Sequence, residues 1–91
     1  GKPAADPEAL ARWTSMLPAV EAAHEPAGVR DWLGPVVPVG VSGTDLTVWV
    51  PNATFSAFLG GSNTLAESLR TAGRGCGITR LVFAVDAGSD H

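Results

Sequence analysis

His24 and its acidic neighbours are the side chains of this sequence that most suggest metal chemistry. Glu21 and Glu25 flank His24 and are one helical turn apart. A stable metal site needs three or four converging ligands, whereas this group offers one histidine at a position expected to face solvent. We therefore interpret His24 as a surface histidine and expect the protein to hold no metal and no cofactor.

The sequence also lacks a recognisable pairing of side chains for nucleophilic or acid–base catalysis. Cys76 is the only cysteine, and no general base is paired with it to activate the thiol. His24 has no serine or cysteine partner at a recognisable spacing. The nine acidic residues are scattered along expected helix and turn surfaces rather than paired. We expect a protein that is not an enzyme.

Three arginines, Arg70, Arg74 and Arg80, fall close together around the glycine-rich segment 73–77. Glycine amides beside basic side chains can bind phosphate, so these arginines are candidate nucleic-acid contacts. The whole chain, however, has six basic and nine acidic residues and a net charge of −3. That balance is opposite to the charge of an electrostatic nucleic-acid binder. Binding of single-stranded nucleic acid is therefore the alternative hypothesis, with Trp49 as a base-stacking platform.

Aromatic and amide side chains supply the candidate contacts for a partner protein, namely Trp13, Trp49, Asn52 and Phe55. Trp13 and Phe55 either close the core or lie on a contact surface. Asn52 either caps the helix that follows it or contacts a partner. Strand alternation places Trp49 on the sheet face away from the helices, where it forms a binding patch or is covered by the chain ends or by the 73–77 loop.

The composition describes one small globular domain. The chain has 91 residues, 45% of them apolar and 16% charged, which argues against disorder and against a second domain. No apolar run is long enough to span a bilayer, and the first residues lack the charged-then-apolar pattern of a secretory leader, so we expect neither a membrane span nor a leader. A single cysteine excludes an internal disulfide, so we expect a reducing, cytoplasmic compartment.

We expect flexible ends at 1–6 and 87–91 around a single domain over 7–86. Both end segments are rich in small and polar residues, and the chain starts at Gly1 rather than methionine. We therefore expect this chain to be a domain of a longer protein.

The first third of the chain predicts two helices. Asp6 and Pro7 form a helix start, and Pro18 is expected to kink or end that helix near its middle. A second, short helix is predicted over 26–33, with Trp32 as a core anchor against the sheet. The apolar stripe of the first helix is Leu10, Trp13, Leu17 and Val20, and the buried face of the second is Val29, Trp32 and Leu33.

The rest of the chain predicts a hairpin, an interrupted helical region and a last strand. Residues 36–50 alternate around the turn 42–45, and Pro38 is placed at the start or edge of the first strand. Helical segments follow over 53–59 and from a capping box at Thr64, separated by two glycines. A flexible glycine turn at 73–77 leads to a strand over 78–85. The predicted faces are Val37, Val39 and Val41; Leu46, Val48 and Val50; Phe55, Phe58 and Leu59; Leu65 and Leu69; and Leu81, Phe83 and Val85.

These elements predict an α+β fold with the order α-α-β-β-α-β. The helices pack on one face of a three-stranded sheet, and the other face is left open.

This order and several local motifs resemble the N-terminal domain of the bacterial chromosomal replication initiator DnaA, which has a fold similar to type II KH domains. The motifs are Trp13, the segment Trp32-Leu33-Gly34-Pro35 nineteen residues later, the alternating 46–50, Pro51-Asn52 and the closing strand 81–85. The similarity covers about 13–85. It is carried by the order and spacing of the motifs together.

The resemblance implies a module that docks other proteins. It implies contact with a replicative helicase or another replication protein, weak self-association, and weak or no affinity for single-stranded DNA. Trp13 matches a self-association position of the family. Gly28 stands where the family often has a helicase-contacting acid, and Thr54 stands where it has a partner-contacting aromatic, with Phe55 adjacent.

Overall fold

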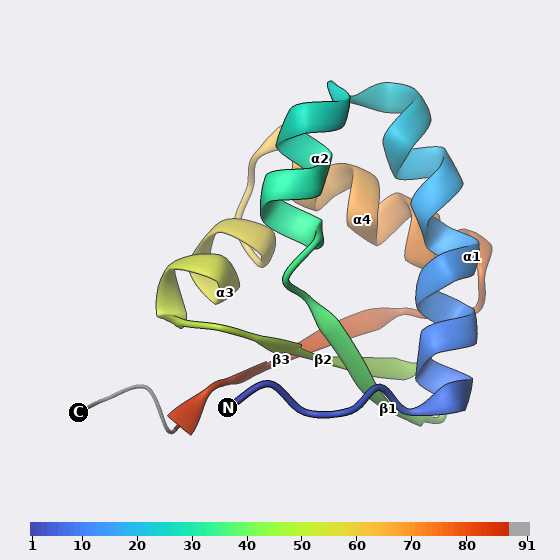
Figure 1. Ribbon diagram of the computed structural model, residues 1–91. Helices are drawn as coiled ribbons and strands as arrows, with labels where there is room; N and C mark the ends of the chain where they lie inside the picture. Colours follow the sequence, from blue (N-terminus) through green and yellow to red (C-terminus); the bar gives the residue numbers. More distant parts are fainter. Residues whose placement is uncertain (88–91) are drawn as a thin grey trace.

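The computed structural model describes residues 1–87, which form an α+β domain with all helices on one face of a mixed three-stranded sheet (Figure 1). This confirms the predicted fold class. The helical region after the hairpin is two separate helices, so the order is α-α-β-β-α-α-β. The elements are α1 (Pro7–Ala23), α2 (Pro26–Leu33), β1 (Val37–Ser42), β2 (Asp45–Val50), α3 (Ala53–Leu59), α4 (Thr64–Gly75) and β3 (Arg80–Val85).

The central strand of the sheet is β2. It pairs antiparallel with β1 and parallel with β3. Leu46, Val48 and Val50 are fully buried on the helix side, as the alternation predicts. Thr47 and Trp49 therefore lie on the open face. The largest of the completely buried side chains are Met16, Val20, Leu46, Val48, Val50, Leu59, Leu69 and Ile78.

The first helix begins as predicted but does not end early. Asp6 caps α1 by accepting a hydrogen bond from the N–H of Ala9 at 3.0 Å. Of the two expected effects of Pro18, a kink or an end of the helix, the end is wrong, since α1 continues to Ala23. Pro18 is exposed, so water can solvate the Thr14 carbonyl that loses its partner. The predicted apolar stripe is also shifted, and the buried residues are Ala9, Trp13, Met16 and Val20.

The hairpin is confirmed, but its first strand does not alternate regularly. The pairing shifts between Pro38 and Gly40, which leaves Val39 in a bulge. As a result Val37 lies opposite Trp49 and Val41 lies opposite Leu46, on different faces of the sheet. The prediction that Val37, Val39 and Val41 share a face is wrong. Pro38 is in an edge strand, as predicted.

The end of α4 uses the glycines in different ways. Gly73 and Gly75 belong to the helix, so the predicted flexible turn is confined to its end. Gly77 has φ +79°, its N–H donates to Arg74, and the N–H of Ile78 donates to the Gly73 carbonyl at 2.8 Å. This is a Schellman cap, and it places Ile78 in the core before β3 begins. At the other end the cap of α4 is Asn63, not Thr64.

The N-terminal segment is held against the sheet by hydrogen bonds. The N-terminal segment is extended and has a contact at each end: the Asp6 N–H donates to the Pro38 carbonyl at 3.0 Å, and the Gly1 ammonium group donates to Asp86 at 2.9 Å. Of the expected C-terminal tail, 88–91 lies outside the described residues. Within residues 1–87 no helix has the length and apolar character needed to cross a bilayer.

Gly43→Ala is expected to lower the free energy of unfolding by about 1–2 kcal/mol, because Gly43 has φ +61° at the hairpin turn. Urea denaturation at unchanged m-value measures the change. Gly28→Ala is the matched control. A Cβ there meets nothing within 4 Å in helix α2, so this variant should gain about 0.5–1 kcal/mol. Equal effects of the two substitutions would contradict the turn geometry.

Candidate functional site

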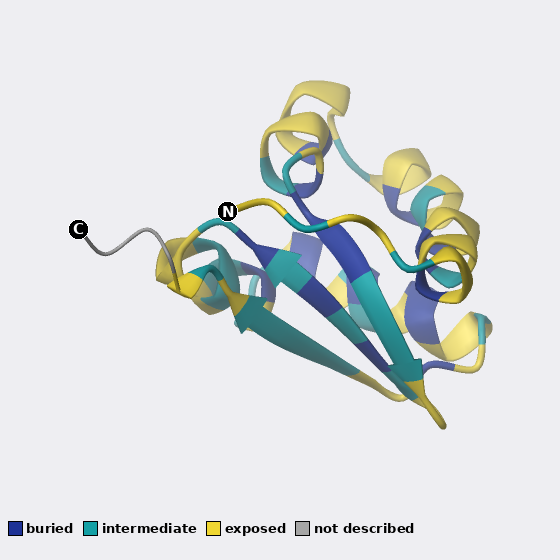
Figure 2. Cartoon of the chain, turned by 60° about the horizontal axis from the view of Figure 1, so that its bottom comes forward, coloured by how far each residue is buried: buried dark blue, intermediate teal, exposed yellow. Residues whose placement is uncertain are grey.

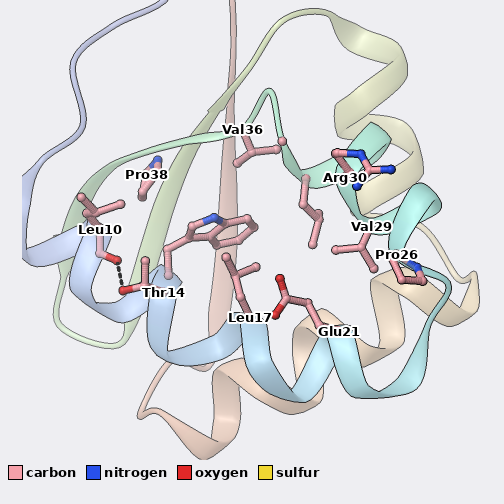
Figure 3. A pocket seen from close by; sticks show the side chains of 12 residues that line it. Leu10, Thr14, Leu17, Glu21, Pro26, Val29, Arg30, Val36 and Pro38 are labelled. Atoms are coloured by element: carbon pink, nitrogen blue, oxygen red, sulfur yellow. Dashed lines mark hydrogen bonds between the residues drawn. The ribbon is translucent and has the colours of Figure 1, made fainter.

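A groove of about 620 Å³ lies between α1 and α2 on the helix side of the sheet, and we call it the α1–α2 groove (Figure 3). Two residues connect these helices, and Figure 1 shows the helices diverging from this connection toward the sheet. The residues before and at the start of β1 close the lower end. The lining residues are Leu10, Trp13, Thr14, Leu17, Glu21, Pro26, Val29, Arg30, Leu33, Gly34, Val36 and Pro38.

The floor of the groove is apolar, and its rim carries isolated charges. Trp13 and Leu33 are buried there, while Leu10 on the rim is 42% exposed. Glu21 comes from α1 and Arg30 from α2 (Figure 3), and neither has an ion-pair partner among residues 1–87. An apolar floor with charges at the edge has the arrangement of a protein-binding surface.

Trp13 is part of the core. Its side chain is only 4% exposed, so it forms the groove floor and does not project as a contact residue. The exposed apolar atoms at this site belong instead to Leu10 and, in part, to Leu17. Leu10 stands in the predicted helical stripe but at its solvent edge. The prediction places Leu10 and Leu17 on the buried face of α1. In the structure the buried positions are one residue earlier, at Ala9 and Met16, so Leu10 is exposed.

Trp49 lies on the open face of the sheet and is partly buried. It forms one cross-strand row with Val37 and Ala84. Val37 is buried although it lies outside the main core cluster. Figure 2 shows the N-terminal segment passing in front of β1 on this face. The segment joins the β1 edge to Asp86 beyond the end of β3, so it crosses the sheet near this row and reduces the patch around Trp49.

Asn52 and Phe55 have structural roles at the start of α3. The Asn52 side chain accepts hydrogen bonds from the N–H groups of Thr54 and Phe55 at 3.0 and 3.3 Å, which confirms its role as a cap. Phe55 is partly buried and meets Trp32 edge to face, with ring centroids 5.1 Å apart. Trp32 stacks on Phe58 at 3.9 Å, so its main aromatic partners are on α3 rather than on the sheet. Thr54 is exposed.

The three arginines do not present free charge as a group. Arg70 pairs with Glu67 at 3.2 Å, and Arg80 pairs with Asp45 at 2.7 Å. The hydrogen bond to Asp45 and the charge of Asp45 raise the pKa of Arg80. Arg74 is exposed and donates to the Thr71 hydroxyl. Acidic partners on two of the three arginines leave little net positive charge for a phosphate backbone.

His24 and Cys76, the remaining candidates for reactive chemistry, lie at contacts between helices and loops. His24 Nε2 lies 2.7 Å from the Ser68 hydroxyl and joins the end of α1 to α4, so it is partly buried rather than on the open surface. The Cys76 carbonyl accepts a hydrogen bond from Arg12 at 3.0 Å, and the thiol is free. In the described part of the chain, no three His, Cys, Asp or Glu residues are grouped as metal ligands.

Comparison with known proteins adds no assignment. No protein-family model, no curated protein and no solved structure matches this chain. The geometry of the described residues is therefore the basis for a functional proposal.

Trp13→Ala is expected to lower the free energy of unfolding by about 3–5 kcal/mol, because it removes a buried aromatic side chain from the core. Leu10→Ala, on the same helix, should change it by less than about 0.5 kcal/mol, since Leu10 is at the rim. Thermal and urea unfolding of both variants tests the assignment of floor and rim. A small loss for Trp13→Ala would place this side chain at the surface.

Proposed function

We propose that this chain is a non-catalytic protein–protein interaction domain of a DNA replication initiation protein. It recruits a replicative helicase or another replication protein and self-associates weakly. The observation that carries the docking role is the α1–α2 groove, with its buried apolar floor and exposed Leu10. The replication context rests on the resemblance in motif order to the DnaA N-terminal domain.

The groove supports docking because it offers apolar surface for a partner to bury and charged side chains that would orient that partner. Apolar side chains on the floor and rim would be removed from water by a partner, which provides the favourable free energy. Glu21 and Arg30 come from opposite helices and have no ion-pair partner within residues 1–87. They would favour one orientation of a partner that carries opposite charges.

A single groove of this size supports weak binding. Low affinity per copy suits an initiator that assembles in several copies, because linked copies raise the effective concentration of the second contact. Helicase recruitment would then depend on assembly of the parent protein rather than on this domain alone.

The proposal is tested by a ¹⁵N-HSQC titration with a replicative helicase, and in parallel with single-stranded DNA. Helicase should shift the amides of residues that line the groove, among them Leu10, Leu17 and Val29. Leu10→Ser should weaken binding at least about fivefold, which corresponds to about 1 kcal/mol of lost apolar contact. Ala19→Ser is the control, because Ala19 is exposed on the same helix α1 but does not line the groove and lies outside β3.

Two results would contradict this role. Absence of helicase-induced shifts at the highest accessible concentration would remove the docking assignment. Shifts caused only by DNA, centred on Trp49, Arg74 and Arg80 and lost with rising salt, would favour the nucleic-acid alternative.

A further inference from the structure

The outer edge of β3 is an apolar strand edge without a partner strand in the described chain. The sheet order is β1-β2-β3, so β3 is an edge strand, and Figure 2 shows no other segment running along its outer side. Between Arg80 and Asp86 the strand has only apolar residues and no proline. Val85 is one of two large apolar side chains that are strongly exposed in residues 1–87. Natural edge strands usually carry charges or proline that prevent such an edge from pairing.

The backbone hydrogen bonds show which groups of β3 point outward. The N–H of Arg80 donates to Thr44, and the N–H of Asp86 donates to Val50, so both point toward β2. Strand alternation then directs the N–H and C=O groups of Leu81, Phe83 and Val85 to the outer edge. Within residues 1–87, these three residues take part in no backbone hydrogen bond outside the sheet. Three donors and three acceptors are thus available along one edge.

The sequence of this edge is complementary to itself in the antiparallel direction. If Phe83 lies opposite Phe83 of a second copy, Leu81 lies opposite Val85 and Arg80 lies opposite Asp86. In this register all three outward residues form hydrogen-bonded pairs. Arg80 and Asp86 have the same strand parity as Trp49's neighbour Ala84, so both lie on the open face. Opposite charges therefore meet at both ends of an apolar junction.

We propose that β3 pairs with β3 of a second copy of this chain, which joins two domains into one continuous six-stranded sheet. The two-fold axis passes through the Phe83 pair, so the contact is isologous and closes as a dimer. On the helix side, Gly60 lies beside Phe83, and an added Cβ at Gly60 would lie 3.3 Å from the ring.

The charged ends of the strand already have partners within one copy. Arg80 is bound to Asp45, and Asp86 is bound to the Gly1 ammonium group. The Arg80 side chain is 70% exposed and has further N–H groups that can reach a second carboxylate. In the dimer these pairs become small charge networks at each end of the junction. The contact is short, so the dimer is weak and forms at high protein concentration or when copies are held together.

This inference specifies the surface of the self-association included in the proposed function. It does not depend on the helicase contact, which uses the α1–α2 groove. Loss of helicase binding with an intact dimer would contradict the proposed function alone, and a dimer insensitive to β3 variants would contradict this inference alone.

The decisive experiment exchanges the charges in two separate preparations, one with Arg80→Glu and one with Asp86→Lys. Each variant alone places like charges opposite each other at both ends, so its dissociation constant should rise about fivefold or more. In a 1:1 mixture, each heterodimer again joins an acid to a base at both ends. Sedimentation velocity of the wild type, each variant and the mixture, up to about 1 mM protein, should show dimer in the wild type and in the mixture. Circular dichroism checks that each variant is folded.

A second pair of variants tests the main-chain pairing. Val85→Pro removes an N–H that points outward, so the monomer should keep its sheet while the dimer loses two hydrogen bonds and becomes undetectable. Val85→Ala keeps the N–H and should weaken the dimer by less than Val85→Pro does. Leu10→Ser, with equal exposure at the groove, should leave the dimer unchanged.

Several results would overturn the inference. They are a wild-type protein that stays monomeric at about 1 mM, a mixture of the charge variants that dimerises no better than either alone, and a dimer that persists in folded Val85→Pro.

Discussion

Burial of one face of β2 is the constraint on which the rest of this structure depends. Leu46, Val48 and Val50 have no solvent exposure, and the strand that carries them has a partner on each side. Three fully buried aliphatic side chains require a complete helical layer over them, which α1, α3 and α4 supply from both ends of the chain. The period of two then determines the other face, because Thr47 and Trp49 must point away from that layer.

The groove and the edge strand arise where this layer and this sheet end. A two-residue connection holds one end of α1 and α2 together, and the helices diverge toward the sheet, so a hollow remains above β1. Within residues 1–87 the sheet has three strands, and its β3 side ends in an apolar strand. Both candidate surfaces are therefore places where a small domain has too few elements to cover its own apolar groups.

The open sheet face, by contrast, is partly covered. The N-terminal segment is held by hydrogen bonds at Pro38 and Asp86, and Val37 is buried beneath the same region. The arginines near this face and on α4 are mostly engaged with acids of the same chain. The pairing of arginines with acids and the N-terminal segment over the open face both weaken the case for nucleic-acid binding there. The strongly exposed large apolar side chains within residues 1–87 lie elsewhere, on the groove rim and at the end of β3.

The sequence by itself determined the elements and the fold class. Asp6-Pro7 marks a helix start, the alternation of 46–50 defines a half-buried strand, and Gly60-Gly61 separates two helices; each signal is local and acts within a few residues. The structural roles of Asn52 as a cap and of Pro38 in an edge strand could also be predicted from residue type alone. The docking role, the helicase and the self-association surface remain hypotheses.

Only the tertiary structure decided which apolar residues are exposed and which strand edges are free. Leu10 and Met16 have similar hydrophobicity, and the rotation of α1 against the sheet alone makes one a rim residue and the other core. The bulge at Val39 and the burial of Trp13 depend in the same way on contacts between segments far apart in the chain. Periodicity describes a face of one element, but the partner of that face is set by packing of all elements together.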